Sequence, residues 1–542
     1  PDRTAGVETF LQGAAPGIDI VSAASEPGMG GQIKLRGNSS VAMSNRPIIY
    51  LDGVRVMDGG SPAVGSVLGS AGLPARLETS PLGQINPNDI ERIEVIKGSA
   101  ATTLYGTEAS AGVIQIFTKR GSTGAPQWSA EVSQGTGWMN KFGLNGGDYL
   151  NMQHYIRDAW WGGGYATDNI GGEPCVTDDE RWDHQLGGDP NGNCSWPGAQ
   201  WYQNYDLSVR GGGQALQYFI SGNYQDDSYT KASDELTKYQ FRGNFTISPV
   251  QDLQIQWNTS FSSQWLSAAP SGNNAEGIEL NAFRQERNYV GSADPRDIAD
   301  LLEYDFQQWN ERLNSGLTLN YSPIQDLTNR FTVGYDFSQQ EGRNLRNFGF
   351  FLYPQGSLGV DLWQKRVLTF DYVGTYSFGL TEGIRSNFSW GGQAIGDDTR
   401  RVRSGGIDFP GAAEPTLSSA ALTRSLEDRE KVWNAGFFFQ NVFDINDKYF
   451  ITGGVRVDGN SAFGSDFGLQ VYPKVSGSYV ISDENFWGDG WGTLKLRAAY
   501  GQSGRAPGAF DAVRTWEPQG FDGRPAFLPE NRGNPALAPE VT

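Results

Sequence analysis

Several features that are common in other proteins are scarce in this chain. Its 542 residues include two cysteines and two histidines, which leaves little material for a disulfide framework or for histidine-dependent catalysis. No run of about 18 apolar residues occurs, so the sequence offers no transmembrane helix. Acidic residues outnumber basic ones by 61 to 42, which gives a formal net charge of −19. That balance argues against nucleic acid as a partner, because phosphate binding requires clustered lysine and arginine.

Glycine (72 residues) and aromatic residues (12%) are abundant instead, and apolar residues follow an alternating pattern. Residues 239–247 put Tyr239, Phe241 and Phe245 on one face of an extended chain, and polar residues such as Arg242 on the other. Period two with an aromatic-rich face predicts β-strands that have one apolar and one polar side. The same alternation occurs in residues 216–224, 253–261, 331–337, 368–376, 449–457 and 494–500.

The lengths of strands and connections distinguish a soluble sandwich from a transmembrane barrel, which share this pattern. The runs reach about ten residues, which is long enough to cross a bilayer at a tilt. Connections alternate between short and long, as periplasmic turns and extracellular loops do in outer-membrane barrels. We therefore predict a barrel of about 13 strands, the first at about 128–136. Short turns are expected near 211–214, 248–252, 322–326, 379–383 and 445–447, and long loops at 138–203, 267–309, 341–362 and 398–429.

The residues before this pattern have a different organisation. Two short β-like runs, Ile90–Ile96 and Gly112–Lys119, flank a turn of small residues around Gly98–Gly106. Two further runs lie upstream, Ile33–Gly37 and Ile48–Gly53. In this order and spacing, these segments resemble the plug domain of a TonB-dependent outer-membrane transporter.

Two more segments narrow the resemblance. Leu11–Gly17 near the start, and Asn86–Ile90 further along, are similar to segments of the SusC/RagA branch of that family. The resemblance implies an all-β transmembrane barrel of about 22 strands whose lumen holds an N-terminal α+β plug domain. It places the plug at residues 1–124 and the N-terminal part of the barrel at residues 125–542.

The strand count gives an expectation about the extent of the chain. About 13 strands are too few to close a barrel of that size, and an open edge in lipid leaves backbone groups without partners. The segments Tyr500–Gly504 and Asn534–Glu540 also resemble the middle of the family's barrel. We therefore expect a fragment that lacks the C-terminal strands. We also expect that Pro1 is a processed or trimmed start and that a coupling segment before the plug is missing.

The resemblance further implies TonB-dependent active import of a nutrient, an oligosaccharide or an oligopeptide, across the outer membrane, with the plug gating the lumen. The implied partners are TonB with its inner-membrane energising complex, a SusD-like surface lipoprotein over the extracellular mouth, and outer-membrane lipid. Three alternatives stay open: a receptor for siderophores or other metal chelates, a surface binding or structural barrel that transports nothing, and a soluble all-β carbohydrate-binding protein. No catalytic constellation is found, so the chain is predicted not to be an enzyme.

Four charged residues lie in or beside the expected plug strands, namely Arg36, Asp52, Glu94 and Lys97. Charges buried in a barrel lumen must be paired. The sequence does not show which residues of the barrel wall would pair with them, so two interpretations stay open. Ion pairs between plug and wall either break during transport or only hold the plug in register.

Plug glycines are interpreted as turn residues. Gly98, Gly106 and Gly112 fit neither phosphate-loop motif, so nucleotide binding is not expected. Together with Gly37 and Gly53, they suit backbone positions with φ above zero in tight turns.

The expected loop at 138–203 contains both cysteines and a group of acidic residues. Cys175 and Cys194 are expected to form a disulfide because cell-surface loops are exposed to oxidising conditions, and two free thiols are the alternative. A structural calcium site and a solvated acidic turn both stay open, because Cys194 and Gln200 stand where a calcium loop has glycine and glutamate. The candidate calcium ligands are Asp178, Asp179, Asp183 and Asp189.

Aromatic residues crowd the same loop. Aromatic rings near polar loops stack on sugars or other flat ligands, but they also form membrane-interface belts and pack loops together. All three interpretations stay open. The candidate ligand-contact residues are Trp160, Trp161, Tyr165, Trp182, Trp196 and Trp201.

Overall fold

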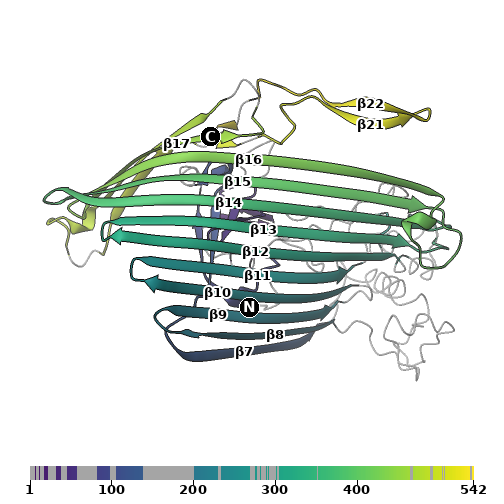
Figure 1. Cartoon of the computed structure of the whole chain (residues 1–542), viewed down its shortest axis with the longest axis horizontal. Coiled ribbons are helices and arrows are strands. Elements are labelled where there is room, and N and C mark those ends of the chain that lie inside the picture. Colours follow the sequence, from purple (N-terminus) through teal and green to yellow (C-terminus); the bar gives the residue numbers. More distant parts are fainter. Residues whose placement is uncertain are drawn as a thin grey trace, which may run out of the picture.

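The computed structural model of the chain contains one long sheet and a smaller domain that lies behind it in the view of Figure 1. None of the helices in the described part of the chain is long and apolar enough to cross a membrane. The structure describes Val7, Leu11 and residues 17–21, 32–37, 45–57, 82–97, 105–137, 200–229, 234–268, 275–277, 281, 289, 291, 301, 304–350, 352–463, 468–488, 492–502, 504–505, 507–537 and 540–541.

The long sheet is a meander of 13 antiparallel strands, in which each strand pairs with its neighbours in the sequence. Figure 1 shows these strands running side by side across the molecule. The predicted number of strands is therefore confirmed. The strands are β7 (Gly124–Gly137), β8 (Gln200–Gly212), β9 (Leu216–Ser228), β10 (Glu235–Val250), β11 (Leu253–Ser267), β12 (Asp305–Ile324), β13 (Leu327–Arg346), β14 (Ser357–Thr381), β15 (Ile384–Ile407), β16 (Leu422–Ile445), β17 (Tyr449–Asn460), β18 (Gln470–Val480) and β19 (Lys495–Gly501).

Several strands are much longer than predicted. β14 has 25 residues, and β15 and β16 have 24 each, against an expectation of about ten. Most of the loops predicted at 341–362 and 398–429 is instead strand, and β15 and β16 stay paired as far as Ile407 and Leu422. The apolar alternation ends where lipid contact ends, but backbone pairing continues beyond it between polar residues. The two connections are therefore 10 and 14 residues long, at 347–356 and 408–421, and shorter than the predicted loops.

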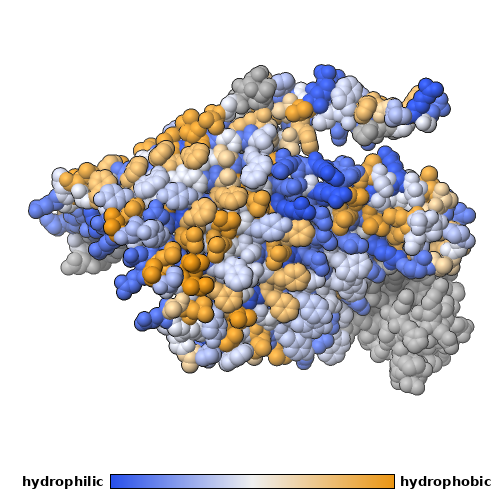
Figure 2. Space-filling model, viewed as in Figure 1, coloured by the Kyte–Doolittle hydropathy of each residue, from blue (hydrophilic) through white to orange (hydrophobic). Residues whose placement is uncertain are grey.

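Side chains alternate between two faces along these strands. The outer face carries exposed apolar residues such as Leu317, Phe370 and Phe437, whose side chain is 67% exposed. The opposite face carries buried polar residues such as Asn314 and Gln393. In Figure 2, hydrophobic side chains spread over the left and central part of the outer face. Apolar outside and polar inside is the pattern of a transmembrane barrel wall.

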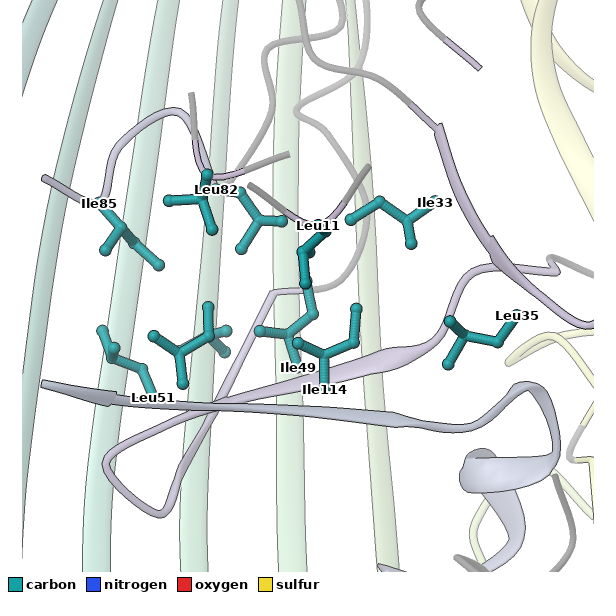
Figure 3. Close-up of a cluster of buried hydrophobic side chains, with 11 residues drawn as sticks. Leu11, Ile33, Leu35, Ile49, Leu51, Leu82, Ile85 and Ile114 are labelled. Atoms are coloured by element: carbon teal, nitrogen blue, oxygen red, sulfur yellow. The ribbon is translucent and has the colours of Figure 1, made fainter. Parts of the chain in front are cut away.

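The smaller domain is the plug, and its main sheet has the order β4-β3-β6-β5. β3 and β6 are parallel, and the other two pairings are antiparallel. In Figure 3, Ile49, Leu51 and Ile114 from this sheet face Leu11 and Leu82 in one buried apolar cluster. Its elements are β1 (Ile18–Val21), β2 (Gln32–Leu35), β3 (Ile48–Leu51), β4 (Val54–Val56), the 3-10 helix η1 (Pro87–Asp89), β5 (Ile90–Ile96), the 3-10 helix η3 (Thr107–Ala111) and β6 (Val113–Thr118).

A two-residue turn joins β3 to β4. Asp52 and Gly53 both have positive φ, at 50° and 89°, and Leu51 pairs with Val54 across the turn. Two central residues with positive φ define a type I′ hairpin turn, for which Asp-Gly is a favoured pair. The turn places the Asp52 side chain at the edge of the plug sheet that meets the barrel wall.

The remaining elements are short. Two 3-10 helices, η6 (Leu417–Ser419) and η7 (Ile481–Asp483), lie between long strands. After β19 the chain forms a separate hairpin of β21 and β22, which projects from one edge of the molecule in Figure 1. The last elements are β20 (Gly504–Arg505), β21 (Thr515–Phe521), β22 (Arg524–Asn531) and β23 (Glu540–Val541), of which β20 pairs with β23.

Candidate functional site

A buried arginine of the wall connects two carboxylates of the plug. Arg242 of β10 points into the lumen, where its Nη1 lies 3.5 Å from Oδ2 of Asp52. Its Nε donates a hydrogen bond of 3.2 Å to Oδ2 of Asp89. All three side chains are at most 5% exposed. A buried charge is stable only when an opposite charge lies close to it. Removing Arg242 would therefore leave the two buried carboxylates without a compensating cation.

Hydrogen bonds extend this ion pair across the interface. Asp52 accepts hydrogen bonds from the Thr118 amide at 2.9 Å and from its hydroxyl at 2.6 Å. Asn244, two residues after Arg242 on the same lumen face of β10, donates to the Thr118 hydroxyl at 2.7 Å and to the Lys119 carbonyl at 2.8 Å. Polar contacts therefore fix the end of β6 to β10.

The short helix η1 supplies a second polar contact. Asn86 caps the helix by accepting a 3.0 Å hydrogen bond from the Asn88 amide, and Pro87 suits the first helical position because it needs no amide donor. The Asn86 side chain also donates a 2.6 Å hydrogen bond to Asp206 of β8. Burial raises the pKa of Asp89, the last residue of this helix, because the loss of solvation outweighs the attraction of Arg242.

We use the name polar seat for these plug and wall residues together. The plug contributes Asn86, Asp89, Asp52, Thr118 and Lys119, and the wall contributes Asp206, Arg242 and Asn244.

Two wall glycines receive a side chain of the plug. A Cβ atom on Gly316 of β12 would lie 2.4 Å from Cγ2 of Val54, and one on Gly334 of β13 would lie 2.5 Å from Cγ1 of the same residue. Glycine is thus required at both positions by the close approach of β4 rather than by backbone conformation. The next plug residues then hydrogen-bond to the wall, with the Arg55 amide 3.1 Å from Thr369 Oγ1 and the Met57 amide 3.3 Å from Asp336 Oδ2.

This steric fit gives a prediction for Gly334→Ala. The added methyl group would lie 2.5, 2.7 and 3.0 Å from three carbon atoms of Val54, so we expect the folded protein to lose roughly 1–3 kcal/mol. Val54→Ala in the same chain removes two of those atoms and is expected to restore most of the loss. Thermal unfolding and proteolysis of the plug in the purified protein measure both effects.

The control for this pair is Gly379→Ala, because a Cβ on Gly379 meets no atom within 4 Å. We expect its unfolding temperature to match that of the unmodified protein. If the unfolding temperature of the double variant is no higher than that of Gly334→Ala alone, contact with Val54 is not the cause of the lost stability.

An apolar contact completes the interface. Ile48, Tyr50 and Val113 of the plug form one buried cluster with Val367 of β14 and Ile395 of β15. The cluster is small compared with the plug's own core, which contains 11 buried residues. Among the plug residues that the structure describes, apolar packing is therefore mainly within the plug and only local against the wall.

The four charged plug residues predicted from the sequence have different surroundings. Asp52 meets the wall at Arg242, as described above. Glu94 instead pairs at 2.8 Å with Arg92 on the same strand, and both side chains are about half exposed. The two residues lie two positions apart on β5, an edge strand of the plug sheet, so they share one face. Arg36 is exposed, and Lys97 is half-buried at the end of β5.

The wall residue Arg242 and the plug residues Asn86 and Asp89 were not predicted as site residues. A signal for Arg242 existed, because a charged residue stood on the polar face of an otherwise alternating strand. Asp89 and Asn86 gave no such signal, since both suit the start of a turn or helix without any partner. Their role follows from the position of η1 against β8 and β10.

Predicted turn glycines can be placed for four of the five positions. Gly37, Gly53, Gly106 and Gly112 have positive φ values of 85°, 89°, 82° and 96°. A Cβ on Gly112 would also lie 2.6 Å from Leu35 Cδ1 and 2.9 Å from the Ile96 carbonyl. Gly98 lies outside the described residues.

Most predicted residues of the large extracellular loop also lie outside the described residues. Trp201 is described, and it lies in β8 with its side chain 58% exposed. Within the described part of the chain, no group of three or more histidine, cysteine, aspartate or glutamate side chains is placed to hold a metal ion. The residues outside the description are Cys175, Cys194, Trp160, Trp161, Tyr165, Trp182, Trp196, Asp178, Asp179, Asp183 and Asp189.

A polar pocket of about 200 Å³ lies where the plug meets β14–β16. The plug contributes Arg55 and Glu108, which form a 3.3 Å ion pair. The wall contributes Lys365 and Asp397, whose charged groups are 3.6 Å apart. The pocket also reaches Asn460, the last residue of β17 on its extracellular side. It therefore lies near the long-loop ends of the strands.

Comparison with known protein families covers both parts of the chain. Residues 3–113 match the TonB-dependent receptor plug domain, and residues 251–542 match the TonB-dependent receptor-like β-barrel. Curated relatives include the TonB-dependent receptor P26 of Formosa agariphila and the TonB-dependent receptor SusC of Bacteroides thetaiotaomicron, each 24% identical. The alignments cover 94% and 93% of this chain and 50% of each relative. The chain thus spans about half the length of the curated relatives it matches.

Solved structures share the fold at lower sequence identity. The RagAB peptide transporter has a TM-score of 0.76 and 19% identity, covering 100% of this chain and 63% of that chain. The siderophore receptor PirA from Acinetobacter baumannii has a TM-score of 0.58 and 13% identity, covering 99% of this chain and 64% of that chain.

The architecture, a plug seated against the polar face of a wall whose other face is apolar, defines the class of plugged outer-membrane barrels. The chain belongs to the TonB-dependent receptor family, and SusC and the RagAB peptide transporter are among the proteins it is similar to. This confirms the predicted family, fold class and outer-membrane location, and it disagrees with the alternative of a soluble carbohydrate-binding protein.

Proposed function

We propose that this chain forms the plug and the adjoining barrel wall of a TonB-dependent importer that moves a nutrient across the outer membrane. The polar seat is the observation that supports this function. Polar contacts between plug and wall can be exchanged for contacts with water when the two separate, whereas a continuous apolar core would resist separation. These contacts therefore suit a plug that leaves the wall and returns to it during transport, rather than a domain that is permanently packed into the lumen.

The proposed partners follow from the same function. An import step against a gradient needs energy, and the TonB system supplies it to the family, so a segment of the full-length protein is expected to contact TonB. The relatives SusC and RagAB support a SusD-like lipoprotein over the extracellular mouth. We also propose that the chain carries out no catalysis and that its transport role requires no cofactor.

The pocket between plug and wall favours an oligopeptide as cargo. Five of its lining side chains are charged, with both signs present, and its lining residues in the described part of the chain include no aromatic residue. Ammonium and carboxylate groups of a peptide complement such a surface, whereas sugar-binding sites rely on aromatic faces. The charged residues of the pocket are Arg55, Glu108, Lys365, Asp397 and Glu430.

Uptake by cells that carry the full-length protein tests this proposal. We expect labelled oligopeptides to enter in an energy-dependent manner, and removal of TonB to reduce uptake to the level of cells without the transporter. Unlabelled peptides are expected to compete at least tenfold better than maltooligosaccharides of similar size.

Other outcomes identify the alternatives. Uptake that persists without TonB would contradict active import. Competition by sugars rather than peptides would leave import intact and overturn the peptide assignment. Uptake of ferric chelates alone would favour the siderophore receptor, and binding without any uptake would favour a surface binding barrel.

A further inference from the structure

The outer face of β14–β16 changes from apolar to cationic within two rows of cross-strand neighbours. Leu368 of β14 pairs with Gly396 of β15, which pairs with Trp433 of β16. All three occupy outward positions, and the side chains of Leu368 and Trp433 point away from the lumen. The next outward row towards the extracellular ends holds Arg366, Asp398 and Lys431. The row after that holds Gln364, Arg400 and Arg429. We use the name cationic patch for Arg366, Arg400, Arg429 and Lys431.

The length of β14 places this change at the edge of the membrane. From Leu380 near the periplasmic turn to Leu368, the outward side chains include Phe370, Tyr376 and Phe378, all exposed on this face. Twelve residues span roughly 40 Å along a strand, or roughly 30 Å along the bilayer normal at a tilt of about 40°. That distance equals the thickness of the hydrocarbon core. The row of Trp433 thus lies at the boundary, where tryptophan is enriched in membrane proteins.

The cationic patch is positively charged, whereas the protein as a whole has a negative net charge. On β14–β16 its four cations face two carboxylates, Asp398 and Glu427, in a chain whose formal net charge is −19. The same rows continue onto β12 and β13, where Glu311 and Glu341 lie on the outer face. Figure 2 shows a hydrophilic area over β14–β16, right of centre, next to the hydrophobic area. The excess of positive charge is therefore confined to β14–β16, at the level where lipid headgroups begin.

Glu427 organises two of the cations. It accepts hydrogen bonds of 2.8 Å from Nε of Arg400 and of 2.8 Å from Nε of Arg429. The two arginine side chains nevertheless remain 47% and 69% exposed. Each guanidinium keeps further N–H groups for an external acceptor, since one carboxylate cannot use all of them. Two adjacent guanidiniums match the geometry of a phosphate group.

We propose that the cationic patch binds a phosphate-bearing lipid headgroup of the outer leaflet. The lipid's acyl chains would lie against the apolar rows of β14–β16, and its phosphate would meet Arg366, Arg400, Arg429 and Lys431. A lipid fits better than a dissolved anion, because the patch adjoins the apolar band and the two parts of the surface match the two parts of one molecule. The site lies on the outside of the barrel, away from the pocket and the polar seat.

Binding of lipid A to the full-length protein in phosphatidylcholine nanodiscs tests this site. The variant carries Arg366→Gln, Arg400→Gln and Lys431→Gln, and the matched control is Lys365→Gln. Lys365 is the sequence neighbour of Arg366, but it points into the lumen pocket. A cation at an anionic lipid surface contributes about fivefold in affinity, so we expect the triple variant to bind lipid A roughly 100-fold more weakly. The control is expected to bind as the unmodified protein does.

Two further measurements test the proposal independently of the triple variant. Inorganic phosphate at millimolar concentration should not displace lipid A, and displacement would show a site for free anions instead. Lipid A affinity of the unmodified protein should fall as salt is raised, which can be measured even if the triple variant does not fold. Equal binding by the triple variant and the unmodified protein, or affinity insensitive to salt, would overturn the proposal.

Discussion

A disulfide between the plug and the wall is expected to abolish uptake. In the double variant Val54→Cys and Gly316→Cys, the Cβ atoms would be 3.9 Å apart, within the usual range for a disulfide. Replacing Val54 also removes the methyl group that a Cβ at position 316 would otherwise meet at 2.4 Å. Because β4 could no longer leave β12, we expect energy-dependent uptake in oxidised cells to fall to that of cells without TonB.

Reduction provides the internal control for this experiment. Adding a reductant to the same cells should restore uptake. Two controls carry one new cysteine each, Val54→Cys with Gly316→Ala and Val54→Ala with Gly316→Cys, and both remove the valine that a Cβ at position 316 would meet at 2.4 Å. Both controls should transport with or without reductant, which excludes mispairing with Cys175 or Cys194 as the cause. Normal uptake by the oxidised double variant would mean that the lumen opens while β4 stays in contact with the wall.

Arg242→Met is expected to have the largest effect on how firmly the plug is held. The substitution removes the cation that faces both Asp52 and Asp89 and leaves two carboxylates buried without it. Loss of one partner from a buried ion pair costs roughly 3–5 kcal/mol. We expect the plug to exchange its amide hydrogens faster and to be released at lower denaturant concentration, while the barrel strands stay protected.

Two variants separate this effect from a general loss of stability. Adding Asp52→Asn and Asp89→Asn to Arg242→Met removes the uncompensated charges, so we expect it to recover most of the plug's protection. Arg429→Gln on the outer face of β16 removes a partner of Glu427, and both side chains are exposed, at 69% and 41%. Exposed pairs contribute at most about 1 kcal/mol. If the plug is as well protected in Arg242→Met as in Arg429→Gln, the polar seat does not hold it.

The plug is held by three kinds of contact at three places on the wall. Polar contacts join it to β8 and β10, the fit of Val54 joins it to β12 and β13, and an apolar cluster joins it to β14 and β15. These contacts lie at separate places, so we expect a pulling force that reaches the plug from one side to break them in sequence. Each step then costs only part of the whole interface.

The strand pattern was predictable because it depends on local chemistry. Lipid on one side and a polar lumen on the other require alternation along each strand, and this appears in segments such as residues 239–247 and 368–376. The small plug strands were also predictable, since their order and spacing match a known family. The loops predicted at 341–362 and 398–429 were too long, because polar strands continue there beyond the apolar band. Both faces of such a strand meet a polar environment, so apolar and polar residues do not alternate along it and its sequence does not predict a strand.

The sequence by itself therefore determined which segments are strands in the membrane, which face of each strand meets lipid, and that a plug precedes them. The tertiary structure decided which residues meet across the lumen. Asp52 was a plausible partner for the wall in the sequence, but Glu94 was equally plausible, and it pairs with Arg92 instead. Pairing between the plug and the wall depends on how η1 and the β3–β4 turn face β10, a separation of more than 100 residues along the chain. Periodicity along one strand contains no information about such contacts.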